Sequence, residues 1–127
     1  MTLNLILMKY ISLILFLASN LISSQTNHQT PYEKGNGNQT TTYEEMVKYY
    51  DDLSKDFPTI TVRAIGNDDN GEPIRVVIYN AAVDKNNPTI LINNGIHPGE
   101  PDGIDATMMM MRDFATGKIE VKNLRIV

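Results

Sequence analysis

Apolar and polar positions divide the chain from Thr42 onward into segments with helical and strand-like spacing. Between Thr42 and Phe57, apolar residues recur every three or four positions, which predicts a helix with one apolar face. Thr42 and Glu45 match a capping box at its start, and Pro58 prevents its continuation. The predicted apolar face comprises Tyr43, Met46, Val47, Tyr50 and Leu53.

Three strand-like segments follow this helix. Residues 59–66 and 73–80 flank a loop rich in turn formers, and its Asn70-Gly71 pair predicts an antiparallel hairpin. Residues 88–93 are nearly all apolar, which is typical of a strand buried on both faces of a sheet. The last residues, VKNLRIV, begin another strand, and we expect the chain to stop inside it.

A second helix is predicted to begin near Pro101, a residue favoured at the first helical position. Its apolar face comprises Ile104, Met108, Met111 and Ala115, and Gly117 is its expected stop. The order is helix, strand, strand, strand, helix, strand. It predicts an α/β fold with layers and with strands that are at least partly parallel.

The N-terminal 41 residues differ in composition. Residues 1–24 carry Lys9, a short apolar run and then small residues, which is typical of a secretory signal peptide. The apolar run is short for crossing a bilayer, although an uncleaved membrane anchor is the alternative. Residues 25–41 are rich in Asn, Thr and Gly, which predicts a flexible leader or surface loop with a solvated His28.

Composition and charge limit the classes of function. The chain has 127 residues, no cysteine and a net charge of -4. This length allows one domain, and the lack of cysteine excludes disulfides and cysteine-based zinc sites. The few Lys and Arg residues form no basic stripe, so we expect no nucleic-acid partner. The signal peptide predicts a secreted or periplasmic protein without stable membrane association after cleavage. The absence of cysteine favours a bacterial source, and the oligomeric state is left open.

The candidate chemistry lies in the turn between residues 88–93 and the second helix. His97 and Glu100 are three residues apart there, where α/β proteins commonly place ligands. An imidazole and a carboxylate at this spacing can bind one Zn²⁺ ion. A polar turn with a capping glutamate is the alternative. Asp102 is expected to have one of two roles. It contacts His97 and orients its imidazole for metal binding, or its negative charge interacts favourably with the N-terminal end of the helix dipole.

Other motifs have simpler interpretations. Met108–Met111 are expected to pack in the core rather than bind copper, because consecutive helix positions point in different directions. Asp68 and Asp69 are expected at a solvated hairpin tip, since the loop lacks the spacing of a calcium site. Arg63 and Arg75 are expected to be surface or sheet-edge charges.

The segment GIHPGEPDG, between an apolar strand and a helix, resembles the first metal-ligand motif of the zinc carboxypeptidase family. The upstream segments TTYEEMVKYYDDLSKDFP and ITVRAIGNDDNGEPIRVVIYN resemble the opening helix and first hairpin of that family, in the same order. The resemblance covers roughly residues 41–127. It implies that residues 42–127 are the N-terminal portion of a mixed-sheet α/β/α fold of the phosphorylase/hydrolase-like type.

The resemblance also implies a function. His97 and Glu100 match the first two zinc ligands of the family, whereas its third ligand and its catalytic glutamate lie later and have no counterpart here. We therefore expect an N-terminal fragment of a zinc-dependent metallocarboxypeptidase that acts on peptide or protein substrates and is inactive by itself. The alternatives are an acyl-amino-acid deacylase of the related zinc family, a non-catalytic peptide- or glycan-binding module of the same fold, and a small independent binding domain.

Overall fold

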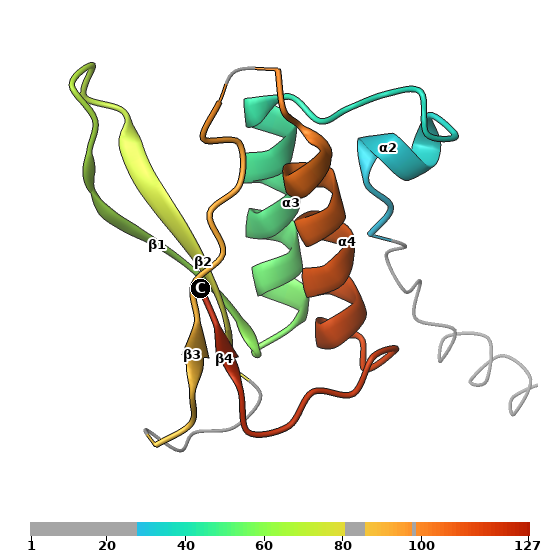
Figure 1. Cartoon of the computed structure of the whole chain (residues 1–127), viewed down its shortest axis with the longest axis vertical. Coiled ribbons are helices and arrows are strands. Elements are labelled where there is room, and N and C mark those ends of the chain that lie inside the picture. The colour runs from blue at the N-terminus through green and yellow to red at the C-terminus, as the bar shows by residue number, and fades with distance from the viewer. Residues whose placement is uncertain (1–27, 81–85, 98) are drawn as a thin grey trace, which may run out of the picture.

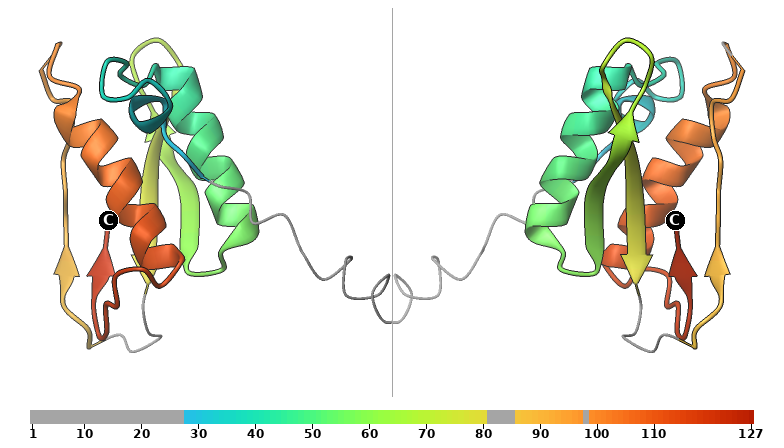
Figure 2. Two further views of the ribbon diagram at one scale, coloured as in Figure 1. Left: turned by 90° about the vertical axis from the view of Figure 1, so that its right-hand side faces the viewer. Right: turned by 90° about the vertical axis from the view of Figure 1, so that its left-hand side faces the viewer.

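The computed structural model describes residues 28–80, 86–97 and 99–127. Two long helices, α3 (Tyr43–Asp56) and α4 (Asp102–Ala115), lie side by side on one side of a sheet, and the short helix α2 (Pro31–Lys34) precedes them (Figures 1 and 2). The predicted mixed α/β class and the predicted order from α3 onward are confirmed. The predicted signal peptide, residues 1–24, lies outside the described residues.

The sheet contains β1 (Ile60–Asn67), β2 (Pro73–Asn80), β3 (Thr89–Ile90) and β4 (Arg125–Ile126). Its four strands have the order β1-β2-β4-β3. The β1–β2 hairpin is antiparallel, as predicted, and its register shifts at a bulge before Gly66. β4 pairs antiparallel with β2 and parallel with β3, so the sheet is mixed. The parallel pair requires a crossover, and α4 provides it.

The prediction for residues 88–93 is wrong in two respects. Only Thr89 and Ile90 form a strand, and this strand lies at the edge of the sheet rather than inside it. Ile90 is 47% exposed and Leu91 is 66% exposed. An apolar run predicts burial only if layers cover both sides of the sheet. Among the described residues, α3 and α4 cover one side.

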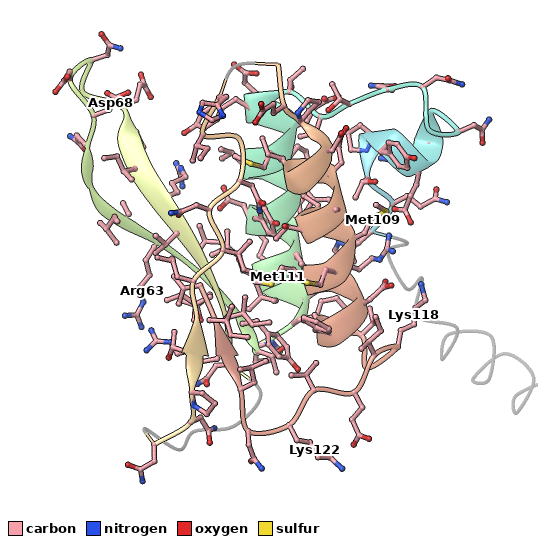
Figure 3. The ribbon with its side chains drawn as sticks, viewed as in Figure 1. Arg63, Asp68, Met109, Met111, Lys118 and Lys122 are labelled. Atoms are coloured by element: carbon pink, nitrogen blue, oxygen red, sulfur yellow. The ribbon has the colours of Figure 1, made fainter. Side chains whose placement is uncertain are left out.

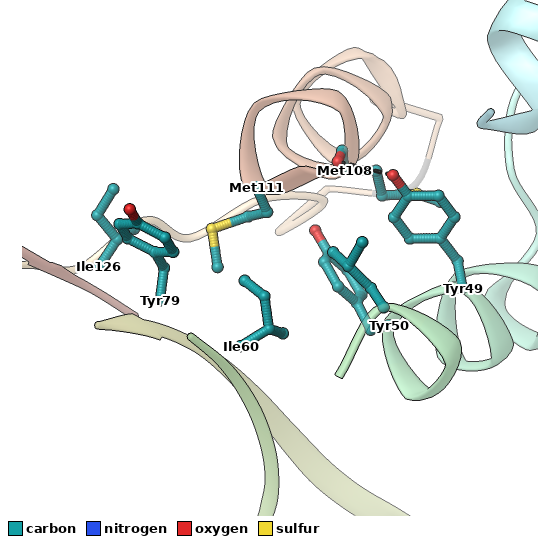
Figure 4. Close-up of a cluster of buried hydrophobic side chains, with 8 residues drawn as sticks. Tyr49, Tyr50, Ile60, Tyr79, Met108, Met111 and Ile126 are labelled. Carbon is teal, nitrogen blue, oxygen red and sulfur yellow. Dashed lines mark hydrogen bonds between the residues drawn. The ribbon is translucent and has the colours of Figure 1, made fainter. Parts of the chain in front are cut away.

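The core lies between the helix pair and the sheet (Figure 4). Leu53 of α3 and the two methionines Met108 and Met111 of α4 are fully buried. Met111 extends from α4 towards Ile60 and Tyr79 of the sheet (Figure 4). The prediction that the run Met108–Met111 packs in the core is therefore confirmed for Met108 and Met111, with Met110 packed against the core from a partly buried position. Burial of side chains of this size contributes on the order of 1.5–3 kcal/mol each.

Helix α3 follows the sequence pattern except at Tyr43 and Tyr49. Thr42 and Glu45 form the predicted capping box, and the helix ends before Phe57. Tyr43, expected on the buried face, is 53% exposed, whereas Tyr49, which was not expected there, is buried. The Tyr49 hydroxyl donates a hydrogen bond to the backbone oxygen of Met108, which explains how a position beside the predicted face can be buried.

Helix α4 has Pro101 as its N-cap residue, close to the predicted start. Gly117, just beyond its end, adopts a positive φ of 74°. All four residues of its predicted apolar face contribute to the core. Met108 and Met111 are buried, while Ile104 and Ala115 pack against the cluster from partly buried positions. The α4 pattern was therefore interpreted correctly.

The prediction of a flexible leader or surface loop over residues 25–41 missed the helix α2, whereas residues 36–40 are exposed, as a surface loop would be. Thr30 is fully buried and caps α2 in a reciprocal capping box with Glu33, and Pro31 occupies the start of that helix. Further along, the Thr40 hydroxyl donates to the Asp105 carboxylate at 2.6 Å. Glu33 is likewise bonded to Arg112 of α4, so two polar side chains of this segment attach it to that helix. Residues 25–27 lie outside the described part of the chain.

Candidate metal centre

The turn that connects β3 to α4 holds the candidate ligands, and its path is fixed by contacts with α4. The Asn94 side chain donates from Nδ2 to the Thr107 hydroxyl at 2.7 Å. Gly95 has a φ of +64°, and a Cβ atom added there would lie 2.7 Å from Cδ1 of Ile104. A Cβ atom added to Gly103 would lie 2.7 Å from Oδ1 of Asn94. The turn therefore depends on two glycines that permit close approach of loop and helix.

His97 and Glu100 lie together in this turn. Nδ1 of His97 and Oε2 of Glu100 are 3.2 Å apart, and the two side chains are 68% and 67% exposed. Bonds of about 2.1 Å to a tetrahedral Zn²⁺ ion place two ligand atoms about 3.4 Å apart. The observed separation therefore suits both a hydrogen bond and a shared metal ion. The donor set, one imidazole nitrogen and one carboxylate oxygen, is one that zinc accepts.

The other acidic side chains near the turn do not complete a ligand set. In residues 28–80, 86–97 and 99–127, no group of three or more His, Cys, Asp or Glu side chains is placed to hold a metal ion. Asp102 is exposed in the first turn of α4, and within the same ranges no hydrogen bond joins it to His97. Its predicted role in orienting His97 remains a prediction. Asp105 is buried and accepts hydrogen bonds from Thr40 and the Thr41 backbone.

His28 lies far from the turn and is not solvated. Its Nε2 atom is 2.9 Å from Oδ2 of Asp56, and its side chain is 7% exposed. Its ring packs against Phe57 and Tyr49, with ring centroids 5.6 Å and 6.2 Å away. These contacts place it beside the C-terminal end of α3, whereas the turn with His97 precedes the start of α4 at the other end of the helix pair (Figure 1). The prediction of a solvated His28 is wrong.

A buried polar cluster around Arg112 was not found from the sequence. Arg112 donates to the carboxylates of Glu33 and Asp113 and to the backbone oxygen of His28. Burial alone would lower the pKa of the guanidinium, but the hydrogen bonds from Glu33 and Asp113 outweigh it and raise that pKa. The signal that identifies the partner is Thr30-Pro31-Tyr32-Glu33, a capping box that positions Glu33.

The carboxylates of this cluster are held in their charged form. For Glu33, burial would raise the pKa, but hydrogen bonds from Arg112 and from the Thr30 backbone together lower it. For Asp113, burial would also raise the pKa, but hydrogen bonds from Lys118 and Arg112 outweigh it. The pKa of Asp113 is therefore lowered as well. The cluster is thus a set of paired charges that attaches residues 28–34 to α4.

The remaining motifs match their simpler interpretations. Oδ1 of Asp68 accepts hydrogen bonds from the backbone N–H groups of Asn70 and Glu72, each at 2.9 Å, which closes the hairpin tip. Asp68 lies at the far end of that hairpin (Figure 3). Arg63 is exposed and points away from the helix layer (Figure 3). Arg75 is also exposed, as predicted for a sheet-edge charge.

Comparison of the chain with models of protein families, with curated proteins and with solved structures gives no match. The mixed α/β class is therefore shown by the structure alone, and His97 and Glu100 are candidate ligands on the geometry of their turn alone. None of the helices formed by residues 28–80, 86–97 and 99–127 has the length and apolar character needed to cross a membrane.

Proposed function

We propose that this chain contributes the first two zinc ligands of a metallocarboxypeptidase-like peptide hydrolase. The observation that supports the proposal is the 3.2 Å separation between Nδ1 of His97 and Oε2 of Glu100 in a turn from a strand to a helix. The order of the GIHPGEPDG segment, the upstream helix and the hairpin is consistent with that family. The carboxypeptidase-like fold, zinc as the cofactor and a peptide or protein as the substrate are parts of the same proposal.

The roles of this chain's residues follow from their chemistry. His97 would hold the ion through its imidazole Nδ1 atom, and Glu100 would hold it through its carboxylate. Bound Zn²⁺ polarises a carbonyl and lowers the pKa of a coordinated water. The two histidines of the sequence are His97 and His28, and His28 is committed to Asp56 and the core near it. In the described part of the chain no third His, Cys, Asp or Glu is placed to join His97 and Glu100, so a third ligand would come from outside those residues. The 127-residue chain is expected to lack turnover by itself.

Zinc binding by the chain tests the ligand assignment directly. Titration with Zn²⁺, followed through the imidazole ¹⁵N resonances, should shift the His97 signals and leave those of His28 unchanged. Equilibrium dialysis should show weaker zinc binding in H97A and in E100A. The matched control is D69N, which changes an exposed acidic residue in the loop between β1 and β2 and should bind zinc as the parent chain does. Equal zinc binding by H97A and the parent chain would refute the assignment.

The reaction is tested on the protein as isolated from its source, with two kinds of substrate. We expect zinc-dependent release of the C-terminal residue from a peptide, lost on chelation and restored by added Zn²⁺. An N-acyl amino acid serves as the second substrate. Deacylation without peptide hydrolysis would replace the peptidase by an acyl-amino-acid deacylase. Activity towards neither substrate would favour a binding module of the same fold.

A further inference from the structure

Asn94 lies at the start of the turn that carries His97 and Glu100, and its side chain reaches back to helix α4. Its Nδ2 atom donates a hydrogen bond to the hydroxyl of Thr107 at 2.7 Å, across 13 positions of the sequence. Both residues are half-buried. The chain runs from β3 along α4, reverses at the turn and enters that helix (Figures 1 and 2). The bond therefore closes a loop that contains both candidate ligands.

Two close approaches extend this attachment along the helix. A Cβ atom added to Gly103 would lie 2.7 Å from Oδ1 of Asn94, so the amide group lies directly against the first turn of α4. A Cβ atom added to Gly95 would lie just as close to Cδ1 of Ile104, which packs against the core. The Asn94 amide group thus contacts α4 through both its nitrogen and its oxygen.

These contacts shorten the stretch of chain that can move independently of the helix. Asn94 and Gly95 are held against α4 on one side of the turn, and Pro101 begins the helix on the other. The stretch between these fixed points is residues 96–100, which includes both candidate ligands. A short segment between fixed ends has fewer conformations than a long one. The bond from Asn94 therefore restricts the positions that the two ligand side chains can adopt.

A hydrogen bond to α4 suits positioning better than an apolar contact would. Its donor–acceptor distance and angle lie in narrow ranges, whereas apolar side chains in contact can slide past each other. The acceptor is itself fixed, because Thr107 precedes the buried Met108 on a helix that packs in the core. Metal sites depend on supporting bonds of this kind, since their ligands must be held within about 0.5 Å of the productive geometry.

We propose that Asn94 is a positioning residue of the candidate metal centre and that Thr107 is its partner on α4. The inference rests on the proposed function, because it assigns Asn94 a role in zinc binding by His97 and Glu100. Asn94 acts through the turn rather than as a ligand. It keeps Nδ1 of His97 and Oε2 of Glu100 near their 3.2 Å separation before the ion binds, so that less entropy is lost on binding.

The experiment measures zinc affinity on the 127-residue chain, by titration with Zn²⁺ followed through the imidazole ¹⁵N resonances of His97. T107V removes the acceptor hydroxyl and leaves a side chain of the same shape, N94A removes the donor, and T107S restores the hydroxyl. The double variant N94A/T107V completes a double-mutant cycle. The matched control is T116V, the same substitution at the C-cap of α4, where the Thr116 hydroxyl donates to the Asp113 oxygen at the other end of the helix.

We expect the zinc dissociation constant to rise about tenfold in T107V and in N94A, the effect of losing a group that orients metal ligands. The double variant should bind zinc as weakly as either single variant, whereas T107S and T116V should bind it as the parent chain does. A merely structural role of the bond would lower stability and leave the affinity of the folded chain unchanged. Parent-like zinc affinity in both T107V and N94A would overturn the proposal.

Backbone ¹⁵N relaxation without zinc separates this inference from the proposed function. In T107V the order parameters of Gly95, Ile96 and His97 should fall from about 0.85 to about 0.6, and T107S should restore them. Residues of the β1–β2 hairpin should keep their order parameters, which would show that the variant is folded. Absence of zinc binding by the parent chain would overturn the proposed function. Unchanged order parameters in T107V would overturn the role of Asn94 even if the parent chain binds zinc.

Discussion

The segment of residues 28–41 and the turn of residues 93–101 use polar side chains in opposite ways. In the first, Thr30 is buried and Glu33 is partly buried, and both Glu33 and Thr40 are bonded to groups that are distant in sequence. In the second, His97 and Glu100 are two-thirds exposed and contact each other. Buried polar groups must be satisfied, so they hold a structure together, whereas exposed ones remain available to a ligand. The exposure of the polar side chains, more than their residue types, distinguishes the segment of residues 28–41 from the candidate site.

Removal of Arg112 should give the largest difference between the two regions. R112A leaves Glu33 and Asp113 as partly buried carboxylates without their main partner, and we expect a loss of about 3 kcal/mol in the free energy of unfolding. Urea denaturation measures this loss. The matched control is K118A, because Lys118 pairs with the same Asp113 from an exposed position and should contribute about 0.5 kcal/mol. Equal losses in the two variants would contradict the anchoring role.

The two aspartates in the first turn of α4 permit a finer comparison. Asp105 is buried and accepts from Thr40 and from the Thr41 backbone, so D105A should lower the free energy of unfolding by about 2 kcal/mol. Asp102 is exposed and interacts with the helix dipole, so D102A should lower it by about 0.5 kcal/mol. Thermal unfolding of both variants measures the difference. A larger loss in D102A would show that the charge in the first turn of α4 contributes more to the free energy of unfolding than the hydrogen bonds between Asp105 and residues 40–41.

Low pH should weaken the attachment of residues 28–34 to α4. The pKa values of Glu33 and Asp113 are lower in the folded chain than in the unfolded chain. Their contribution to stability is therefore fully present above the unfolded values, about 4.3 and 3.9, and is lost as the pH falls through the folded values. In E33Q the urea midpoint should be lower at pH 7, and its decrease between pH 5 and pH 3 should be shallower than in the parent chain. A parallel pH profile for E33Q would exclude Glu33 as a contributor.

Substitution of the candidate ligands should have the smallest effect on folding. His97 and Glu100 are exposed, so H97A and E100A should change the free energy of unfolding by less than about 0.5 kcal/mol. Urea denaturation without added metal is the measurement. The same variants should lose zinc binding, which would separate function from stability at this turn. A loss of more than about 1 kcal/mol in H97A would assign a structural role to the imidazole.

Local signals in the sequence predicted most of the elements. The capping box at Thr42, the Asn70-Gly71 turn and the helical spacing of Met108 and Met111 each depend on a few neighbouring residues, and each prediction was confirmed. The errors concerned layers and distant partners. Whether residues 89–92 are buried depends on what covers the second side of the sheet. Whether residues 28–41 are ordered depends on Arg112 and Asp105, which are more than 60 positions away.

The candidate site shows the same division. The pairing of His97 with Glu100 follows from their spacing, and the structure places the two side chains in contact. The two hydrogen bonds that occupy Asp105 did not follow from the sequence, because Thr40 and Thr41 belong to the segment expected to be solvated. No spacing rule identifies a partner from a different element. The metal and the reaction depend on a third ligand and a general base, which the spacing of His97 and Glu100 does not identify.

The close approach between the turn and α4 predicts how the chain would tolerate random substitution. Gly95 combines a φ of +64° with a neighbouring Ile104 side chain, and Gly103 faces an Asn94 side chain that is fixed by its bond to Thr107. In a library scored for folded protein, these two glycines should be the most depleted positions of the region, while His97 accepts many residues. A library scored for zinc binding should retain both glycines and His97. The two glycines, which carry no reactive side chain, are thus the positions of this region at which substitution is tolerated least.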